Sequence, residues 1–398
     1  MDPRFAPLAE LAVWGVNLQP DQVLVITAEH GEAEAARAVA AAAYRRGARF
    51  VQVNYFDPHV KRARIEYARA ETLEFVPAWL EEAALAHAEG HGARIVFAGM
   101  TEPNIFEGLD PERLGKDQLP RLSVNARIVS ERLSNWCGIA APHPAWATVV
   151  FPAPEPAEAY ERLWAEIEHV LRLDEPDPVA AWEARLAELR EHARILSERR
   201  FDAIHLQGPG TDLTIGLLPS ARWWAADFTT AEGLRHVPNL PTEEVFTTPD
   251  PARADGFVTS TKPLALMGGA TVRGLRVRFE GGRAVEIDAD ENGDLLRRRL
   301  ELDSGGERLG ELALVDGSGR IGPLETTFFH TLLDENAASH IALGNGFPFL
   351  IDDELDRSRV NVSSVHVDFM VGSPEVEVTG ITAAGDRVAV LRGGAWAF

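Results

Sequence analysis

The sequence predicts a mixed α/β protein, with an N-terminal parallel-sheet α/β domain followed by a C-terminal α+β domain of mainly antiparallel sheet. Strand and helix patterns alternate through the first half, whereas short strands separated by turn residues fill the second half. The 398 residues, 45% hydrophobic and 25% charged, are typical of a globular chain with room for two or three cores. We place the boundary near residue 200 and expect domains at 1–200 and 201–398.

The first half begins with a β-α-β unit. The β-branched run DQVLVITAE at 21–29 predicts a strand, the alanine-rich stretch at 32–47 ends at a glycine and predicts a helix, and ARFVQVNYF at 48–56 predicts a second strand. The alternation continues with a helix at 76–92 and a strand at 93–100. Strands joined through helices run parallel, so this half should form a parallel sheet covered by helices.

Two amphipathic patterns at 158–173 and 178–200 predict the helices that end the first half. After them the strands become short and turn-bounded, and they fall at 201–218, 275–290 and 376–394. Glu-Gly-Gly-Arg in the middle of the second stretch is a hairpin turn signal, so an antiparallel sheet fits this half best.

Composition and charge exclude several classes of function. A net charge of −22 repels nucleic acid and anionic membranes, and no apolar run reaches the roughly 20 residues that span a bilayer. The first β-α-β unit carries no GxGxxG and the chain no GxxxxGKS, which argues against a nucleotide site. The start of the chain lacks a basic, apolar secretion signal, and Cys137 is the single cysteine, as expected of a buried thiol in a reducing compartment. We expect a cytoplasmic protein that binds neither nucleic acid nor membrane.

The stretch NVSSVHVDFMVG places His366 and Asp368 two residues apart in a predicted strand. Side chains two apart in a strand share one face, so the imidazole and the carboxylate should lie side by side. Such a pair either forms a structural hydrogen bond or supplies two ligands to a metal ion.

The stretch VPNLPTEEVFTTPDP holds Glu243 and Glu244 between prolines that favour extended backbone. Adjacent side chains in extended backbone point in opposite directions. We therefore expect one of these carboxylates to face a cleft and the other to make a structural bond.

Three further carboxylates and two histidines stand among apolar or small residues. Glu311 follows a glycine and leads an apolar strand, where it is a ligand candidate or a strand-edge acceptor. The stretch FFHTLLDENAASHIALGNGFPF carries the others, which are His330, Asp334, Glu335 and His340. We expect His330 to be a core histidine and Asp334 to cap the N-terminus of a helix over ENAASHIAL.

Taken together, these stretches offer oxygen and nitrogen donors without a thiolate. Such a set suits a pair of divalent ions such as zinc, cobalt or manganese, which need a bridging carboxylate when they lie a few ångströms apart. Metal ions polarise a carbonyl and lower the pKa of water, so a hydrolase of this kind needs no serine or cysteine nucleophile. Neither a GxSxG elbow nor an HExxH helix occurs in the sequence.

Five motifs of the second half then carry a family resemblance, and they are GPGTDLTIGL, NLPTEEVFTTP, LGELALV, TLLDENAASHIALG and VHVDFMVGS. The resemblance includes the stretch PHPAWATVVFP of the first half and so extends over nearly the whole chain. In order and approximate spacing they resemble the thermophilic aminopeptidase family of metallopeptidases, M29. The resemblance implies a cytoplasmic, homodimeric enzyme with two divalent ions per chain, usually zinc or cobalt, with manganese or magnesium as further options. It implies that single amino acids are released from peptides with a free amino terminus, at a metal site in the C-terminal domain. Our hypothesis for the mechanism is attack on the scissile carbonyl by a hydroxide that bridges the two ions.

Carried over motif by motif, the resemblance implies a set of five metal ligands, with Glu311 as the bridging carboxylate. They are Glu244, Glu311, His340, His366 and Asp368. Glu335 is a weaker candidate as a further ligand or as the group that binds the substrate ammonium. A carboxylate beside the ions, either Glu335 or Glu243, is the expected general acid and base.

The sequence departs from the pattern of the family at Phe347, seven residues after His340, where the family typically has a tyrosine. A phenol donates a hydrogen bond to a developing oxyanion and a phenyl ring does not. Two alternatives therefore stay open. One is a ring-cleaving dioxygenase of the same fold, in which His340, His366 and Asp368 would hold a single Fe(II) ion. The other is a metal-binding protein that has lost peptidase activity.

Overall fold

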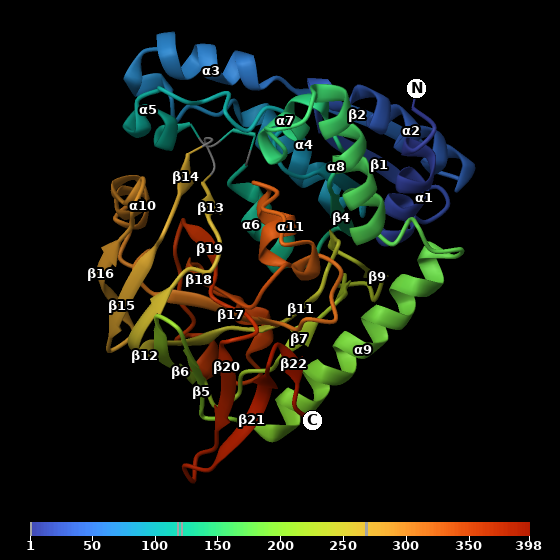
Figure 1. Ribbon diagram of the computed structural model, residues 1–398. Helices are drawn as coiled ribbons and strands as arrows, with labels where there is room; N and C mark the ends of the chain where they lie inside the picture. Colours follow the sequence, from blue (N-terminus) through green and yellow to red (C-terminus); the bar gives the residue numbers. More distant parts are fainter. Residues whose placement is uncertain (1, 118, 121, 267–269) are drawn as a thin grey trace. The chain divides into compact units, whose positions relative to one another are not determined.

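The computed structural model describes residues 2–117, 119–120, 122–266 and 270–398 (Figure 1). The chain forms two compact units, of which the first comprises Met1–Glu183 with Asp227–Pro241 and the second Ala184–Ala226 with Thr242–Phe398. The division falls inside helix α9 (Pro178–Arg199). The segment Asp227–Pro241 belongs to the first unit although the sequence places it in the second half. The domain boundary that the sequence predicts near residue 200 stays a prediction.

The first unit contains a five-stranded sheet in which every neighbouring pair is parallel, in the order β10-β4-β3-β1-β2. Its strands are β1 (Val23–Glu29), β2 (Phe50–Phe56), β3 (Ala93–Phe97), β4 (Trp136–Ile139) and β10 (Asn239–Leu240). The predicted parallel sheet is therefore confirmed. Cys137 lies on β4 and is fully buried, and this burial raises the pKa of its thiol well above the usual range.

Helices connect these strands, as the alternating pattern predicted. They are α1 (Phe5–Gly15), α2 (Ala33–Arg45), α3 (Pro58–Tyr67), α4 (Ala78–Glu89), α5 (Pro111–Lys116), α6 (Val124–Ser130), α7 (Pro144–Val150) and α8 (Pro156–Val170). In α2 small apolar side chains make up the buried face, so the helix packs closely on the sheet. Helix α3 begins where the carboxylate of Asp57 accepts from the backbone N–H groups of His59 and Val60. A short strand pair, β8 (Phe228–Thr229) with β9 (Arg235–His236), completes this unit.

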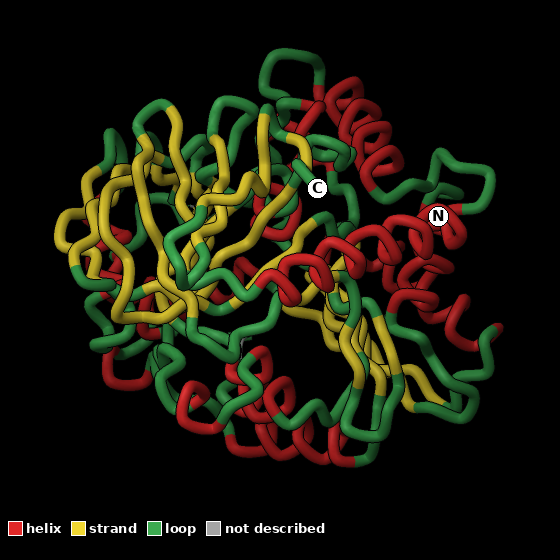
Figure 2. The backbone as a smooth tube through the Cα atoms, turned by 90° about the horizontal axis from the view of Figure 1, so that it is seen from below, coloured by secondary structure: helices red, strands yellow, loops and turns green. Residues whose placement is uncertain are grey.

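The second unit has more strand than helix (Figure 2) and contains an eight-stranded antiparallel sheet. In spatial order its strands are β16 (Arg283–Asp288), β15 (Arg276–Glu280), β12 (Pro249–Thr259), β6 (Thr211–Leu217), β5 (Ala203–Gly208), β20 (Glu377–Ile381), β21 (Arg387–Arg392) and β22 (Ala395–Trp396). The β15–β16 hairpin turns at the predicted Glu-Gly-Gly-Arg. The antiparallel sheet expected after residue 200 is confirmed.

A second antiparallel sheet in this unit holds all five predicted ligands. Its order is β19-β18-β17-β11-β7. The bounds are β7 (Trp224–Ala225), β11 (Glu244–Thr247), β17 (Leu309–Val315), β18 (His340–Gly344) and β19 (His366–Met370). Strand β17 is buried along its whole length and β18 likewise, so the side chains that they carry lie inside the protein.

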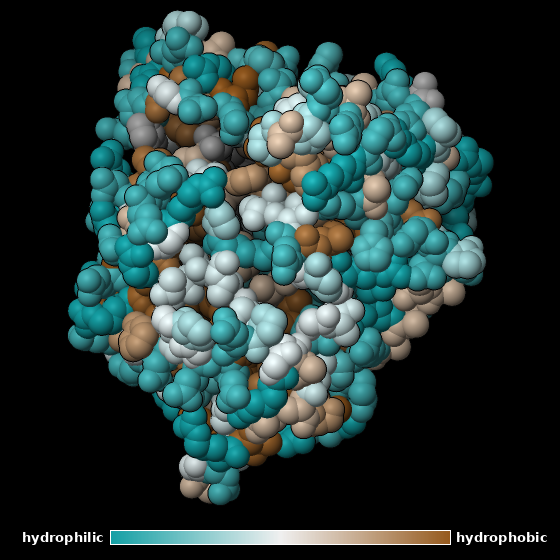
Figure 3. Space-filling view, in the orientation of Figure 1, coloured by the Kyte–Doolittle hydropathy of each residue, from teal (hydrophilic) through white to brown (hydrophobic). Residues whose placement is uncertain are grey.

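The remaining elements of the second unit are short. They are α10 (Gly293–Leu300), α11 (Thr331–Glu335), α12 (Glu354–Arg357) and the strand pair β13 (Leu264–Ala265) with β14 (Thr271–Val272). Across the described residues, none of the helices is both long and apolar enough to cross a bilayer. Most of the molecular surface visible in Figure 3 is hydrophilic, in agreement with the net charge of −22.

Candidate metal centre

Strand register places three of the predicted ligands on one face of the five-stranded sheet. Glu311 lies opposite Ala342, and Ala342 lies opposite Asp368. Directly paired residues point to the same face, as do residues two apart on one strand. His340, two residues before Ala342, therefore shares the face of Glu311 and Asp368.

The same rule places the other two predicted ligands on this face of the sheet. Glu244 is paired with Val315, which is four residues after Glu311, and His366 stands two residues before Asp368. All five predicted ligands therefore project from one face, contributed by the neighbouring strands β11, β17, β18 and β19.

An irregularity in the register helps to aim Glu311. The pairing of β17 with β18 shifts between Leu309 and Glu311, so Gly310 forms a bulge. A Cβ atom at Gly310 would lie 2.2 Å from the carbonyl oxygen of Asn345 and 2.4 Å from that of Gly344. The glycine before Glu311 is thus required by close backbone approach, which explains the Gly-Glu pair seen in the sequence.

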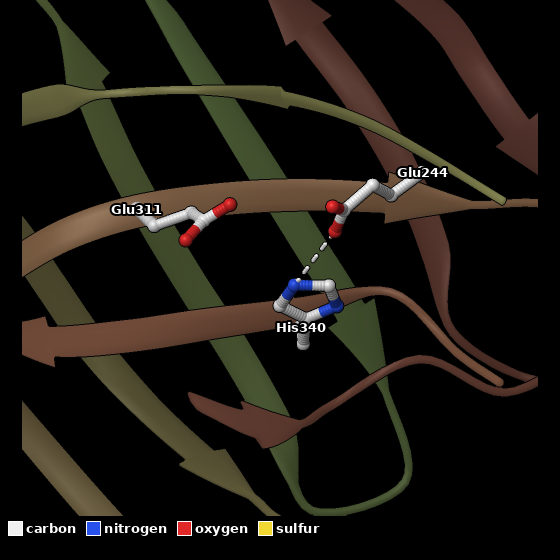
Figure 4. Close-up of side chains that lie close together, drawn as sticks. All are labelled: Glu244, Glu311 and His340. Atoms are coloured by element: carbon white, nitrogen blue, oxygen red, sulfur yellow. Dashed lines mark ion pairs between the residues drawn. The ribbon is translucent and has the colours of Figure 1, made fainter. Parts of the chain in front are cut away.

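Side-chain distances bring the five donors into two overlapping groups. Glu244, Glu311 and His340 form one group, and Glu311, His366 and Asp368 form the other, with donor atoms in each group within 4.8 Å of one another. Figure 4 shows the first group, in which Oε2 of Glu244 lies 3.1 Å from Nε2 of His340. In the second group, Nε2 of His366 lies 3.1 Å from Oε2 of Glu311 and 3.2 Å from Oδ1 of Asp368. Glu311 is common to both.

Both histidines present the same ring nitrogen to the carboxylates. Nδ1 of His366 lies 2.8 Å from the carbonyl oxygen of Asn345, and Nδ1 of His340 lies 3.2 Å from that of Ala338. A carbonyl oxygen only accepts hydrogen bonds, so each Nδ1 carries a proton and each Nε2 faces the other donors. This is the arrangement in which a histidine ligates a metal ion through Nε2 while its backbone contact fixes the ring.

The protonation of the site reflects crowded acidic groups in a buried place. Burial raises the pKa of Glu311 to about 7, with the charges of Asp368 and Glu244 adding to the effect and His366 opposing it. Burial by itself lowers the pKa of His340, but the hydrogen bond and charge of Glu244 raise it to about 10. Cations inside this site are therefore strongly stabilised, whether they are protons or metal ions.

The two groups differ in their exposure. The side chain of His340 is 1% exposed, whereas that of His366 is 23% exposed. The His366 end is therefore the side from which a ligand can reach the donors.

Glu335 lies beside the site without belonging to either donor group. It stands at the end of α11 and lines, together with Asp368 and Met370, a cavity of about 10 Å³, room for roughly one water. Burial of its carboxylate raises the pKa of Glu335 well above its usual value, as do the charges of Asp368 and Glu244. Glu335 is thus a carboxyl group that can hold a proton at the edge of the donor set.

Glu243 and Glu244 reach different partners, as expected of adjacent side chains in extended backbone, and the expected structural bond is present at Glu243. That Glu244 faces a cleft stays a prediction. Glu244 reaches His340, and Glu243 is 0% exposed with its Oε2 2.6 Å from Nε of Arg185. The backbone N–H of Glu243 donates to Oδ1 of Asn336 at 2.6 Å. These contacts give Glu243 a structural partner and favour Glu335 over it for proton transfer.

Two expectations about the neighbouring segment have different outcomes. His330 is 3% exposed, as expected for a core histidine. The expectation that Asp334 caps a helix over ENAASHIAL is wrong, because α11 ends at Glu335 and strand β18 begins at His340. The buried carboxylate of Asp334 instead accepts from the backbone N–H groups of Phe328 and His330. Asp334 holds the loop before α11, which places Glu335.

Phe347 packs on the second donor group. Its ring centroid lies 5.5 Å from that of His366, and the rings of Phe246 and Phe349 adjoin it. Its backbone N–H donates to Oγ1 of Thr248, whose hydroxyl also donates to the carbonyl oxygen of Gly310. Phe347, where the resemblance implies a tyrosine, is thus held at the accessible end of the site.

Sequence reasoning did not find the residues that support the ligands. Arg185, Asp316 and Asn336 surround Glu243, and Asp303 holds the loop that leads into His366. Arg185 appears in the sequence as one charge on an amphipathic helix, 58 residues from Glu243. Only the structure brings these side chains together.

The donor set fits a pair of divalent ions. It combines three carboxylates and two imidazoles without thiolate, one carboxylate is shared, and both imidazoles offer Nε2. A single ion would leave part of this buried acidic set without a counter-charge.

Comparisons with known proteins agree with this chemistry. The chain is 43% identical over 403 residues to aminopeptidase T of Thermus aquaticus, an alignment that covers 98% of this chain and 97% of that protein. It is 36% identical over 401 residues to aminopeptidase AmpS of Bacillus subtilis (strain 168), with 98% and 97% covered.

Solved structures give the same result. The structure of wild-type AmpT from Thermus thermophilus matches with a TM-score of 0.91 at 40% identity over 99% of each chain. A 2,5-dihydroxypyridine dioxygenase from Pseudomonas putida KT2440 matches with a TM-score of 0.53 at 12% identity over 98% of each chain, a likeness that shows the fold alone. The sequence profile of the thermophilic metalloproteases (M29) matches residues 1–396. The chain belongs to the thermophilic metalloprotease family M29.

Proposed function

We propose that this protein is a metal-dependent aminopeptidase that binds two divalent ions and releases single amino acids from the free amino end of peptides. The observation that carries the proposal is the shared position of Glu311 between two groups of donors, within a chain 43% identical to an aminopeptidase. Glu244 and His340 would hold one ion, His366 and Asp368 the other, and Glu311 both.

Bound divalent ions supply Lewis-acid polarisation of the scissile carbonyl and a nucleophilic water at neutral pH. The chain contributes proton transfer. We assign this role to the carboxyl group of Glu335, which shares a cavity with Asp368 and has a raised pKa. It would accept a proton from the attacking water and pass it to the leaving amine. Glu243 was the other candidate, but it is fully buried against Arg185.

The amino terminus of the substrate is a cation, and the carboxylates around the site favour it. The accessible end beside His366 is bordered by Phe347, which offers an apolar surface to the first side chain of the peptide. We propose a substrate with a free ammonium group and an apolar first residue, such as leucine.

The family resemblance and the donor types also support finer assignments. We propose zinc or cobalt as the native ions, because imidazole and carboxylate ligands suit them, with manganese or magnesium as weaker candidates. A cytoplasmic homodimer is our proposal for the working form. Light scattering of the purified protein tests the dimer, since a monomer mass would contradict it.

The Fe(II) dioxygenase alternative has less support. It needs two histidines and one carboxylate, whereas Glu244 and Glu311 are additional carboxylates in contact with those histidines. Metal stoichiometry separates the two, because the dioxygenase requires one iron per chain and the peptidase two ions.

The experiment that tests the proposal compares a leucine-initiated peptide with its N-acetylated twin, using metal-stripped protein reconstituted with zinc or cobalt. We expect leucine release from the free-amine peptide alone, and loss of that release on addition of a chelator. No release with any divalent ion, despite two ions bound per chain, would leave the metal-binding protein without peptidase activity as the better description. Equal cleavage of both peptides would contradict amino-terminal specificity.

A further inference from the structure

The buried side chain of Arg185 lies behind one half of the donor set. Its Nε is 2.6 Å from Oε2 of Glu243, its Nη2 is 2.9 Å from Oδ1 of Asp316, and its Nη1 is 3.0 Å from Oγ of Ser318. The arginine side chain is 5% exposed, and those of Glu243 and Asp316 are 0% and 5% exposed. The planar guanidinium thus joins two buried carboxylates in a fixed geometry.

These two carboxylates flank the pair of strands that carries Glu244. Glu243 directly precedes Glu244 on β11, and Asp316 directly follows Val315, the residue of β17 that pairs with Glu244. Arg185 therefore holds strands β11 and β17 together at the end where Glu244 projects its side chain from the sheet. Ser339, beside His340, extends the link through hydrogen bonds between its hydroxyl and the backbone of Val315.

Asp303 supports the other half of the donor set, and we call Arg185 and Asp303, each with its hydrogen-bond partners, the two polar hubs. Oδ1 of Asp303 accepts from the backbone of Gly305 and from Oγ of Ser363, at 2.9 Å and 2.8 Å. Its Oδ2 accepts from the backbone N–H and the hydroxyl of Ser364, at 2.7 Å and 2.6 Å. Ser363 and Ser364 lead directly into the strand that carries His366 and Asp368, so Asp303 fixes the start of that strand.

The two hubs support separate parts of the site. Arg185 acts on the strand ends beside Glu244 and His340, whereas Asp303 acts on the loop before His366. Their hydrogen bonds involve different residues throughout, and Glu311 is the member common to the two donor groups.

We propose that Arg185 and Asp303 are positioning residues for two different ions, Arg185 for the ion of Glu244 and His340 and Asp303 for the ion of His366 and Asp368. This inference rests on the two-ion centre of the proposed function. It predicts that the ions can be weakened one at a time by substitutions that touch no ligand. Residues that hold metal ligands in place commonly change metal affinity by about 10-fold to 100-fold when replaced.

The substitutions are chosen to keep size and, for the arginine, charge. In Arg185→Lys an ammonium replaces the fork that joins Glu243 to Asp316, so the buried charges keep a cation but lose the rigid link. In Asp303→Asn an amide NH₂ replaces one acceptor oxygen and faces groups that donate. Matched controls in the same unit are Arg253→Lys, whose arginine pairs with Asp202, and Asp353→Asn, whose aspartate caps α12.

The experiment titrates Co²⁺ into the metal-free full-length proteins, following heat and the visible absorption of the bound cobalt. We expect two ions in the unsubstituted protein. Arg185→Lys should weaken one ion by about 10-fold to 100-fold and leave the other unchanged, and Asp303→Asn should do the same to the other ion. The two controls should bind both ions normally, and thermal unfolding by circular dichroism should show every variant folded at the assay temperature.

A ligand background identifies which ion each hub serves. In His340→Ala the ion of Glu244 is already weakened, so adding Arg185→Lys should change cobalt binding no further, whereas adding Asp303→Asn should still weaken the remaining ion. The proposal would be overturned if Arg185→Lys and Asp303→Asn each weakened both ions equally. It would also be overturned if neither variant changed the dissociation constants of the two cobalt ions. Two ions bound without peptide hydrolysis would refute the proposed function but leave this inference standing, while one ion per chain would refute this inference.

Discussion

Oε2 of Glu311 lies 3.1 Å from Nε2 of His366, while the same side chain also belongs to the donor group of Glu244 and His340. Glu311 occupies this place because it projects from β17, the strand between β11 and β18, just after the bulge at Gly310. One residue therefore connects the buried half of the site with its accessible half.

The accessible half gives the first prediction. Phe347→Tyr should raise kcat for leucine release, by about tenfold or more, because a phenol beside His366 can donate a hydrogen bond to the developing oxyanion. Steady-state kinetics with the reconstituted enzyme measures the change. Phe349→Tyr is the matched control, since its ring adjoins Phe347. An unchanged or lower kcat in Phe347→Tyr would show that the site does not use a donor at this position.

Proton transfer gives the second prediction. Glu335→Gln should lower kcat by about 10² to 10⁴ and leave both ions bound, because Glu335 lies outside both donor groups and its proposed role is proton transfer. Kinetics and metal analysis on the same sample make the comparison, with Glu354→Gln on α12 as a control. Loss of an ion together with activity would instead make Glu335 a ligand.

Proton competition gives the third prediction. The metal-free site holds His340 with its pKa raised to about 10 and Glu311 with its pKa raised to about 7, so metal binding must displace protons. Affinity for Zn²⁺ should therefore increase as pH rises from 6 to 8, with protons released on binding. Calorimetry in two buffers of different ionisation heat counts those protons. Binding independent of buffer and pH would contradict the protonated metal-free site.

The first unit gives a prediction about stability. Burial raises the pKa of Glu32 to about 8, and the charge of Glu29 adds to this although a hydrogen bond from the backbone of Glu29 opposes it. The folded state therefore binds the proton more tightly than the unfolded state, and stability is lost as pH rises toward the folded pKa. Glu32→Gln should remove this loss and gain on the order of a few kcal/mol at pH 8 relative to pH 5. Urea unfolding at the two pH values measures it, and equal pH dependence of both proteins would refute the assignment.

Local patterns in the sequence predicted much of the fold. The β-α-β alternation, the Glu-Gly-Gly-Arg hairpin and the His-x-Asp pair depend on residues near one another in the chain, and all three are present. The different partners of Glu243 and Glu244 follow in the same way from extended backbone. The helix expected over ENAASHIAL failed because residues 340–344 pair with two neighbouring strands, and tertiary pairing overrides local helix propensity.

The supporting residues could not be predicted for a related reason. Arg185 is 131 residues from Asp316, and Asp303 is 60 residues from Ser363. Neither stands in a motif, and a charged residue on an amphipathic helix is usually solvated. Only the folded chain shows that Arg185 is buried between two carboxylates.

The central claim is that Glu311 holds two ions at once, and counting cobalt in Glu311→Gln tests it most directly. The amide keeps the size of the side chain but cannot bridge two cations as a carboxylate does. We expect two tightly bound ions per chain in the unsubstituted protein, loss of tight binding at both positions in Glu311→Gln, and loss of leucine release with them. Retention of two tight ions and full turnover in Glu311→Gln would contradict the shared-carboxylate centre.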